Sequence, residues 1–271
     1  MISIVAGISG LVIGSFFNVL IWRLPRGESI VFPASHCVSC GRKIRPWENI
    51  PVLSYLFLRG KCAGCKEPIS PVYPLIELIT AAASVALWYL FAQKVLAGSV
   101  DIFLSTSVIL QALFLLMMIP MAVIDFRHYI IPDFFTLPII TAGLIISFLP
   151  GGITPLQSFI GILGGGGVLY LIGWIGTIAL KKGDAMGGGD IKLMAAAGAL
   201  FGLEISLMGI VFGALLGSVA GIGMIVTKKL SVDHRIPFGP FLGAGIWIAV
   251  LAGKAIVNFY IGFMDSLVIA L

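Results

Sequence analysis

Residues 102–124 read IFLSTSVILQALFLLMMIPMAVI, a stretch without a single charged side chain. About 20 such residues in a helix are enough to cross the ~30 Å hydrocarbon core of a bilayer. In that core every backbone N–H and C=O needs a partner within the protein, and a helix supplies those partners within its own segment. The stretch therefore predicts a transmembrane helix, and it ends directly before an acidic residue, Asp125.

The rest of the chain has the same character. Of its 271 residues 59% are hydrophobic and only 11% are charged, and the mean hydropathy is +1.11, whereas a soluble domain carries about 25% charged residues. We expect an all-α polytopic membrane protein with about eight transmembrane helices. The apolar segments are 2–22, 74–93, 102–124, 134–149, 157–180, 191–203, 205–227 and 239–261. Segment 191–203 is too short to cross the bilayer unless protein shelters it, and 254–271 is expected to lie at the interface or to extend the last span.

The basic residues predict the orientation. No basic residue precedes segment 2–22, and Arg23 and Arg26 follow it. This is the reverse of a cleaved secretory signal, so a retained span with the N-terminus outside is expected. In that orientation 15 of the 17 Lys and Arg residues fall in the cytoplasmic segments 23–73, 125–133, 181–192 and 228–238, as the positive-inside rule requires. The net charge of +5 then reflects topology and contact with the lipid bilayer, and no nucleic-acid partner is expected.

All four cysteines lie in the one sizeable polar segment, 23–73. Cys37 and Cys40 form one C-x2-C pair, Cys62 and Cys65 form a second, and 21 residues separate the pairs. This spacing is close to that of tetrathiolate zinc sites. A loop of about 50 residues buries too little apolar surface to fold unaided, so a structural zinc is the favoured interpretation and iron stays open as an alternative. Disulfides are disfavoured because a cytoplasmic loop is kept reduced.

Two other features, one in segment 23–73 and one just after it, each have two interpretations. The stretch WENIPVLSYLFLRGK, 47–61, is expected to form either a small core around the metal or a surface for a cofactor or substrate. Glu77 falls just inside segment 74–93, where a buried carboxylate needs a partner. An arginine of the loop or a substrate amine is expected there, with structural pairing favoured.

Two aspartates are candidates for chemistry. Asp125 ends the third apolar segment and Asp190 begins the sixth, directly after the glycines of GGGD, 187–190. In the expected orientation both lie at the cytoplasmic side, where charged groups near the membrane are costly and usually functional. Two carboxylates that share a site hold one proton between them, and such a pair can activate water and polarise a carbonyl. Asp133 is expected to stabilise the start of the next helix.

Several motifs together resemble the bacterial type IV prepilin peptidases, membrane aspartyl proteases of the GxGD class. The matching stretches are GSFFNVLIWRLP at 14–25, ENIPVLSYLFLRGKC at 48–62, PISPVYPLIELITA at 68–81, IIPD at 130–133 and GGGDIKLMAAAGALFG at 187–202. The resemblance implies that Asp125 and Asp190 are the catalytic pair. It also implies that 1–22 is the first transmembrane helix, 23–73 a cytoplasmic tetracysteine loop associated with methylation, and 74–271 a transmembrane peptidase domain.

The resemblance further implies an activity and its location. Enzymes of this family cleave the basic leader of type IV prepilins and type II secretion pseudopilins at the cytoplasmic face of the bacterial inner membrane. Many transfer a methyl group from S-adenosylmethionine to the new amine, although no residues for binding it can be named from the sequence. A transporter or channel that uses intramembrane carboxylates is the alternative, and a metal-sensing scaffold is a third. The sequence makes no prediction of oligomeric state.

Overall fold

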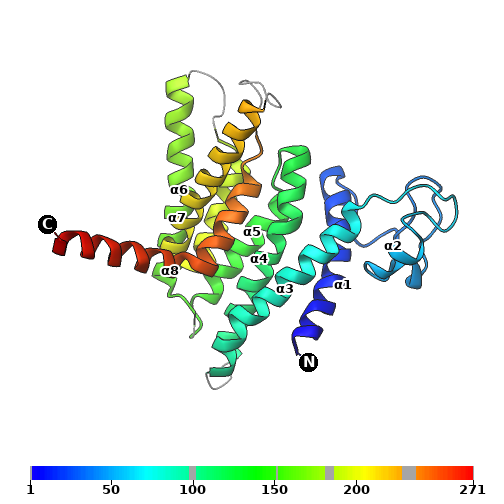
Figure 1. Cartoon of the computed structure of the whole chain (residues 1–271), viewed down its shortest axis with the longest axis horizontal. Coiled ribbons are helices and arrows are strands. Elements are labelled where there is room, and N and C mark those ends of the chain that lie inside the picture. Colours follow the sequence, from blue (N-terminus) through cyan, green and yellow to red (C-terminus); the bar gives the residue numbers. More distant parts are fainter. Residues whose placement is uncertain (1, 98–101, 151, 181–185, 228–235, 271) are drawn as a thin grey trace. The chain divides into compact units, whose positions relative to one another are not determined.

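The computed structural model describes residues 2–97, 102–150, 152–180, 186–227 and 236–270, and these contain helices but no strands beyond two isolated bridges. The expected cytoplasmic segments at 181–192 and 228–238 therefore lie partly outside the described residues. The helices are α1 (Ile2–Arg23), α2 (Leu53–Phe57), α3 (Val72–Ala97), α4 (Ile102–His128), α5 (Asp133–Ile146), α6 (Pro155–Leu180), α7 (Gly188–Val226) and α8 (Gly239–Ala270) (Figure 1). Short 3-10 turns cover Leu24–Arg26 and Pro46–Asn49.

Among the described residues, six helices are long and apolar enough to cross a membrane: α1, α3, α4, α6, α7 and α8. The all-helical membrane fold expected from the sequence is confirmed. The count of eight differs because α5 is a shorter apolar helix and because α7 spans two of the expected segments. The tail from residue 254 extends the last helix, since α8 continues to Ala270.

The two segments within α7 meet at Gly202. This residue has φ 80° and ψ −175°, a non-helical conformation that interrupts the 39-residue helix. Only glycine adopts such angles without strain. The break therefore falls at a glycine, and any other residue at this position would be strained. The first part is the short segment that was expected to need shelter, and its residues 193–200 are all buried.

Side chains bind backbone carbonyl groups around this break, two of them from other helices and one from α7 itself. The hydroxyl of Ser158 donates to the carbonyl oxygen of Ala199 at 2.9 Å, and Nε2 of Gln111 donates to that of Leu200 at 2.9 Å. The hydroxyl of Ser206 donates to the Gly202 oxygen at 3.0 Å. A broken helix is tolerated in a membrane only when its freed polar groups are bound in this way.

The chain divides into two compact units. The first comprises residues 1–100 and 116–124, and the second comprises 101–115 and 125–271. In the first unit α1 and α3 pack closely at Gly10 and Gly14, four residues apart. A Cβ at Gly10 would lie 2.7 Å from the Cα of Ala81, and one at Gly14 would lie 2.7 Å from the Cα of Glu77. Small residues at this spacing let membrane helices approach backbone to backbone.

Glycines also bring helices close together in the second unit, where α6, α7 and α8 lie side by side (Figure 1). Gly161 of α6 and Gly198 of α7 face each other so closely that a Cβ at Gly161 would lie 2.2 Å from the Gly198 oxygen. A Cβ at Gly245 of α8 would lie 2.3 Å from the Gly209 oxygen. The sequence also predicts a close helix contact at the quartet 164–167. Its first three glycines make such a contact, whereas Gly167 faces open space.

These contacts predict a position-specific effect of adding one methyl group. Gly161→Ala should push α6 from α7 and lower the stability of the folded protein by about 1–3 kcal/mol, the usual range for overpacking. The measurement is the midpoint of thermal unfolding in detergent. Gly167→Ala, on the same helix, is the matched control and should leave the midpoint unchanged or raise it. Equal midpoints for both variants would contradict the contact.

Candidate active site and metal centre

Asp125 lies in the last turn of α4 and is 6% exposed. Its Oδ2 accepts a hydrogen bond of 3.0 Å from the backbone N–H of Gly239, and this bond is buried. Gly239 is the first residue of α8, so the carboxylate of Asp125 binds the N-terminal end of that helix. The N-terminus of a helix carries partial positive charge and free N–H groups, which stabilise a carboxylate.

Asp190 lies in the first turn of α7 and is 9% exposed. Its backbone N–H donates to the oxygen of Gly187 at 3.1 Å, which closes the first turn of the helix. A Cβ at Gly187 would lie only 3.0 Å from Oδ2 of Asp190. The glycine before the helix thus leaves room for the carboxylate beside the backbone.

The structure brings the two candidate aspartates together. Their carboxylates interact electrostatically, and Ile131 packs against the backbone beside both. A Cβ at Gly189 would lie 2.9 Å from the Cβ of Ile131, and one at Gly239 would lie 2.9 Å from Ile131 Cδ1 and 2.7 Å from Asp125 Oδ2. Three helix ends therefore meet at one buried site. The sequence analysis did not single out Gly239, although the Pro-x-Gly-Pro run at 237–240 marks the start of a helix.

Asp133 behaves as the sequence predicts, because it lies in the first turn of α5. Its Oδ1 also forms an ion pair with Nζ of Lys192 near the start of α7, at 2.6 Å. Both side chains of this pair are exposed, at 54% and 41%, so its contribution to stability is small. Asp133 is the exposed member among these three aspartates.

The four cysteines converge, as expected, on one point. Their sulfur atoms all lie within 4.8 Å of one another, and the Sγ atoms of Cys37 and Cys65 are 3.9 Å apart. A tetrahedral zinc ion with Zn–S bonds of about 2.3 Å places its sulfurs roughly 3.8 Å apart. The donor set and its spacing therefore fit a tetrathiolate metal ion.

The two C-x2-C turns share one backbone pattern. The N–H of Cys37 donates to the Arg42 oxygen at 2.9 Å, and the N–H of Cys62 donates to the Glu67 oxygen at 2.8 Å. Each cysteine oxygen accepts from the residue four positions later, Gly41 in the first turn and Lys66 in the second, and both of these have positive φ. The turns are thus equivalent, and each aims two sulfurs at the same point.

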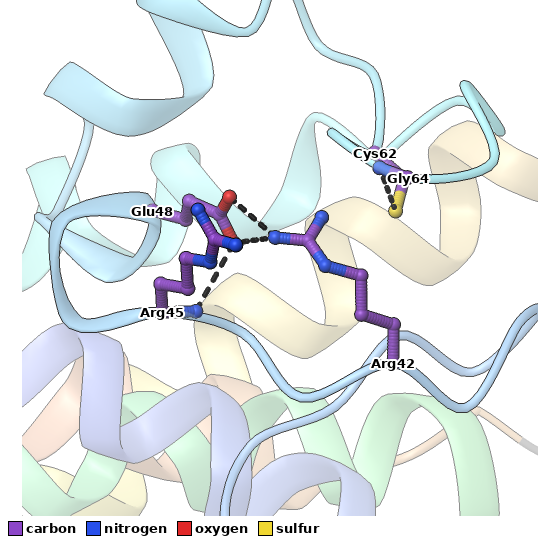
Figure 2. Close-up of polar contacts among 5 residues, drawn as sticks. All are labelled: Arg42, Arg45, Glu48, Cys62 and Gly64. Carbon is purple, nitrogen blue, oxygen red and sulfur yellow. Dashed lines mark hydrogen bonds and ion pairs between the residues drawn. The ribbon is translucent and has the colours of Figure 1, made fainter.

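Backbone N–H groups also prepare two of the four sulfurs for a metal. Those of Cys40 and Ser39 lower the pKa of the Cys37 thiol to about 6. Those of Cys65 and Gly64 lower the pKa of the Cys62 thiol, and the Gly64 N–H lies 3.4 Å from the Cys62 sulfur (Figure 2). The thiolate is the form that binds metal, so these contacts favour coordination.

An ion pair joins the first turn to the segment that follows it. Arg42 donates to both oxygens of Glu48, at 2.5 and 2.7 Å, and the Arg45 N–H donates to the same carboxylate at 3.0 Å (Figure 2). These contacts lower the pKa of Glu48, with the Arg42 hydrogen bond as the main cause. A Cβ at Gly64 would lie 3.1 Å from Cδ of Arg42. The arginine therefore contacts the second turn while it binds Glu48.

Glu77 is buried, at 8% exposure, and its partner comes from the loop, but that partner is not an arginine. Oε2 of Glu77 accepts a hydrogen bond of 2.7 Å from the N–H of Val52. Of the two arginines that line the same cavity as Glu77, Arg42 binds Glu48 and Arg23 donates to the oxygens of Ser29 and Pro33. The expectation of structural pairing holds, while the expected arginine partner is wrong.

The stretch 47–61 does not form a small core. Trp47, Leu56 and Phe57 are 62%, 63% and 83% exposed. Glu48, Tyr55 and Leu58 instead line a cavity shared with α1 and α3. The small core expected from the sequence is therefore wrong, and the surface for a cofactor or substrate stays a prediction.

Fold and sites together define a polytopic membrane protein with a buried aspartate pair and a tetracysteine loop. Residues 8–91 match the bacterial peptidase A24 N-terminal domain, and residues 112–222 match the type IV leader peptidase family. The chain is 35% identical to a prepilin leader peptidase/N-methyltransferase of Aeromonas hydrophila over 275 residues, covering 93% of this chain and 91% of the relative. Proteins of the same name from Pseudomonas aeruginosa and Bacillus subtilis are 33% and 36% identical, covering 94% of this chain and 91% and 96% of their own lengths.

The chain therefore belongs to the type IV leader peptidase family. The transporter or channel alternative finds no support in these relatives. No solved structure matches the chain.

The metal centre can be tested by measuring how much metal the purified protein binds. Cys37→Ser should lower the metal bound per chain, because a tetrahedral site that loses one thiolate binds its ion much more weakly. Elemental analysis of the purified protein measures this. Ser39→Ala changes a residue between the same two cysteines without removing a sulfur, and it should keep the metal. Full metal content in Cys37→Ser would show that the ligands are wrongly assigned.

Proposed function

We propose that this protein removes the leader peptide of prepilins and pseudopilins with Asp125 and Asp190, and then methylates the newly exposed amine. The observation that carries the proposal is the meeting of two buried carboxylates at the ends of α4 and α7. It occurs in a chain whose relatives are named prepilin leader peptidase/N-methyltransferase over nearly their whole length. Among the described residues, only three acids are buried, and of these only Asp125 and Asp190 interact electrostatically with each other.

Orientation follows from the positive-inside distribution of Lys and Arg. With the N-terminus outside, the end of α4, the start of α7 and the tetracysteine loop all face the cytoplasm of the bacterial cell, and the chain lies in the inner membrane. The basic leader of a prepilin would then reach the site from the cytoplasm while its apolar helix stays in the bilayer.

The geometry supports different roles for the two aspartates. Asp125 receives the N–H of Gly239 at the start of α8, which stabilises its ionised form. It is the group that takes a proton from the attacking water. Asp190 is buried beside it and holds the proton that two close carboxylates must share. The protonated carboxyl O–H of Asp190 donates a hydrogen bond to the scissile carbonyl oxygen as the water oxygen adds to the carbonyl carbon. When the C–N bond breaks, Asp125 returns its proton to the leaving amine.

The glycines of the GGGD stretch leave the backbone open to a substrate. Gly188 meets no atom within 4 Å where a Cβ would lie, so the backbone before Asp190 is uncovered. An extended substrate segment can lie directly against such a backbone. This arrangement suits cleavage of a peptide that has left its helical conformation at the membrane surface.

Methyl transfer is assigned to the unit that contains residues 23–73. S-adenosylmethionine, when bound, supplies a methyl carbon that forms a bond to the amine nitrogen as its bond to sulfur breaks, leaving S-adenosylhomocysteine. The amine attacks through its lone pair and releases a proton to a base. The four cysteines would hold a zinc ion in a structural role, since four thiolates leave no open position on the metal.

Replacement of either aspartate tests the proposed pair. Asp125→Asn and Asp190→Asn should each lower the rate of leader removal by about 10²–10⁴-fold or more, the range attributed to general acid and base groups. Cleavage of a purified prepilin, followed by mass analysis of its N-terminus, is the measurement. Asp133→Asn, at the exposed aspartate, should cleave at the wild-type rate. Normal cleavage by either of the first two variants would refute the assignment. A transporter would instead show altered uptake of ions and no effect on a pilin.

Gly239 provides a second test of the same geometry. A Cβ in Gly239→Ala would lie 2.7 Å from Oδ2 of Asp125, so the carboxylate must move. Leader cleavage should fall by at least about 10-fold, because displacement of a catalytic group by about 1 Å is costly. Gly188→Ala, which meets nothing within 4 Å, should fold and stay soluble in detergent to the same extent. The idea fails if Gly239→Ala cleaves as fast as the wild type.

A further inference from the structure

The loop segment that contains α2 exposes apolar side chains between the two C-x2-C turns. Ile50, Leu53, Leu56 and Phe57 are between 45% and 83% exposed, and Trp47, just before them, is exposed as well. These five residues are called the apolar tip. Single exposed apolar residues are common, whereas several in one short segment mark a surface that binds lipid or protein. The apolar tip therefore needs a partner.

A hydrogen bond holds this segment beside a membrane-spanning helix. The N–H of Val52, directly before α2, donates to Oε2 of Glu77 at 2.7 Å. Glu77 lies in the second turn of α3, within the stretch that is long and apolar enough to cross a membrane. The start of α2 is thus fixed next to the part of α3 that enters the bilayer.

A groove of about 680 Å³ between the loop and α1 gives the same level. Val12, Phe16 and Val19 line its α1 side, and Ile50 and Pro51 belong to its loop side. Val12 lies roughly 16 Å before the end of α1, at a rise of 1.5 Å per residue. This length is about half of a ~30 Å hydrocarbon core. The loop side of the groove is therefore level with one leaflet of the bilayer, where exposed side chains meet lipid.

Basic side chains flank the apolar tip. Arg45 precedes it, Arg59 and Lys61 follow it, and all three are exposed. Among the described residues, no ion pair engages any of the three. The guanidinium carbon of Arg45 lies 5.5 Å from the centre of the Trp47 ring. Tryptophan rings are enriched at the level of lipid headgroups, and basic side chains near them are attracted to anionic lipids.

We propose that the apolar tip inserts into the interface of the bilayer leaflet at the end of α1, and that the flanking bases bind anionic phospholipid headgroups. Lipid fits this surface better than a second protein does, because the surface lies level with spanning helices and its positive charge is complementary to an anionic leaflet. The tip would then hold the loop against the membrane while the cysteine turns hold its metal. This contact does not depend on the proposed peptide cleavage or methyl transfer.

Tryptophan fluorescence tests the contact in the full-length protein. The protein is reconstituted in vesicles of phosphatidylcholine and phosphatidylglycerol whose acyl chains carry bromine, a short-range quencher. The emission of Trp47 is obtained as the difference between the wild type and Trp47→Phe, which keeps an aromatic ring at this position. It should lose most of its intensity to brominated lipid and little to acrylamide in the water. Stronger quenching by acrylamide than by lipid would overturn the inference. Quenching by neither would show that protein covers the tip, and this too would overturn it.

A double variant removes the apolar contact. Leu56→Ser combined with Phe57→Ser should reduce quenching of Trp47 by brominated lipid and increase quenching by acrylamide, because the tip leaves the bilayer. Val38→Ser changes an exposed apolar residue of the first C-x2-C turn and should be quenched like the wild type. Each variant is compared with its own Trp47→Phe form, and metal content per chain shows that its loop is intact. Unchanged quenching in the double variant would contradict insertion of the tip.

The charge is tested by varying the lipid. Replacement of part of the phosphatidylcholine by phosphatidylglycerol should increase the quenching of wild-type Trp47 by brominated lipid. The increase should be smaller in the double variant Arg59→Gln and Lys61→Gln, because two of the three flanking bases become neutral. Lys254→Gln removes an exposed base of α8 and is the matched control. An equal response of the wild type and the double variant to the anionic lipid would refute the contact with headgroups.

Discussion

The hydrogen bond from the Gly239 amide to the carboxylate of Asp125 is the contact on which the aspartate site depends. An ionised group at the membrane boundary is costly unless its charge is stabilised. Here the last turn of α4 supplies the acid and the first residue of α8 supplies the donor, so neither helix end can shift without exposing an unsatisfied polar group. Asp190, at the start of α7, joins them. The proposed reactive site is thus made from helix termini, where free backbone groups already lie.

The same requirement, that every buried polar group be bound, explains the interior of the second unit. The interruption at Gly202 would be unfavourable in a hydrocarbon environment if its carbonyl groups were left free. Ser158, Gln111 and Ser206 bind them. Closely packed glycines bring α6 near enough to α7 for the Ser158 contact to form. The hydrogen bonds to these carbonyl groups therefore depend on the close packing of helices at glycines.

Much of this could be predicted from the sequence. The apolar segments, the convergence of the cysteines and the proximity of Asp125 to Asp190 follow from local pattern and membrane sidedness. Three features could not be predicted. Gln111 and Ser158 bind α7 from distant helices, and no spacing in the sequence connects them. Glu77 binds a backbone amide, a group that every residue carries. The cavity lined by Glu48 and Tyr55 gathers residues from separate turns of an irregular loop and from α1 and α3, and only folding brings them together.

The equivalence of the two cysteine turns has a consequence for exchange of the ion. Each turn is a preformed bidentate chelator, because its own backbone hydrogen bonds fix the direction of both sulfurs. When one turn releases the ion, the other retains it, and the 21-residue tether keeps the released pair at an effective local concentration in the millimolar range. Recapture is then faster than escape. The ion should exchange slowly with free metal in solution even though two of its ligands, Cys40 and Cys65, are exposed.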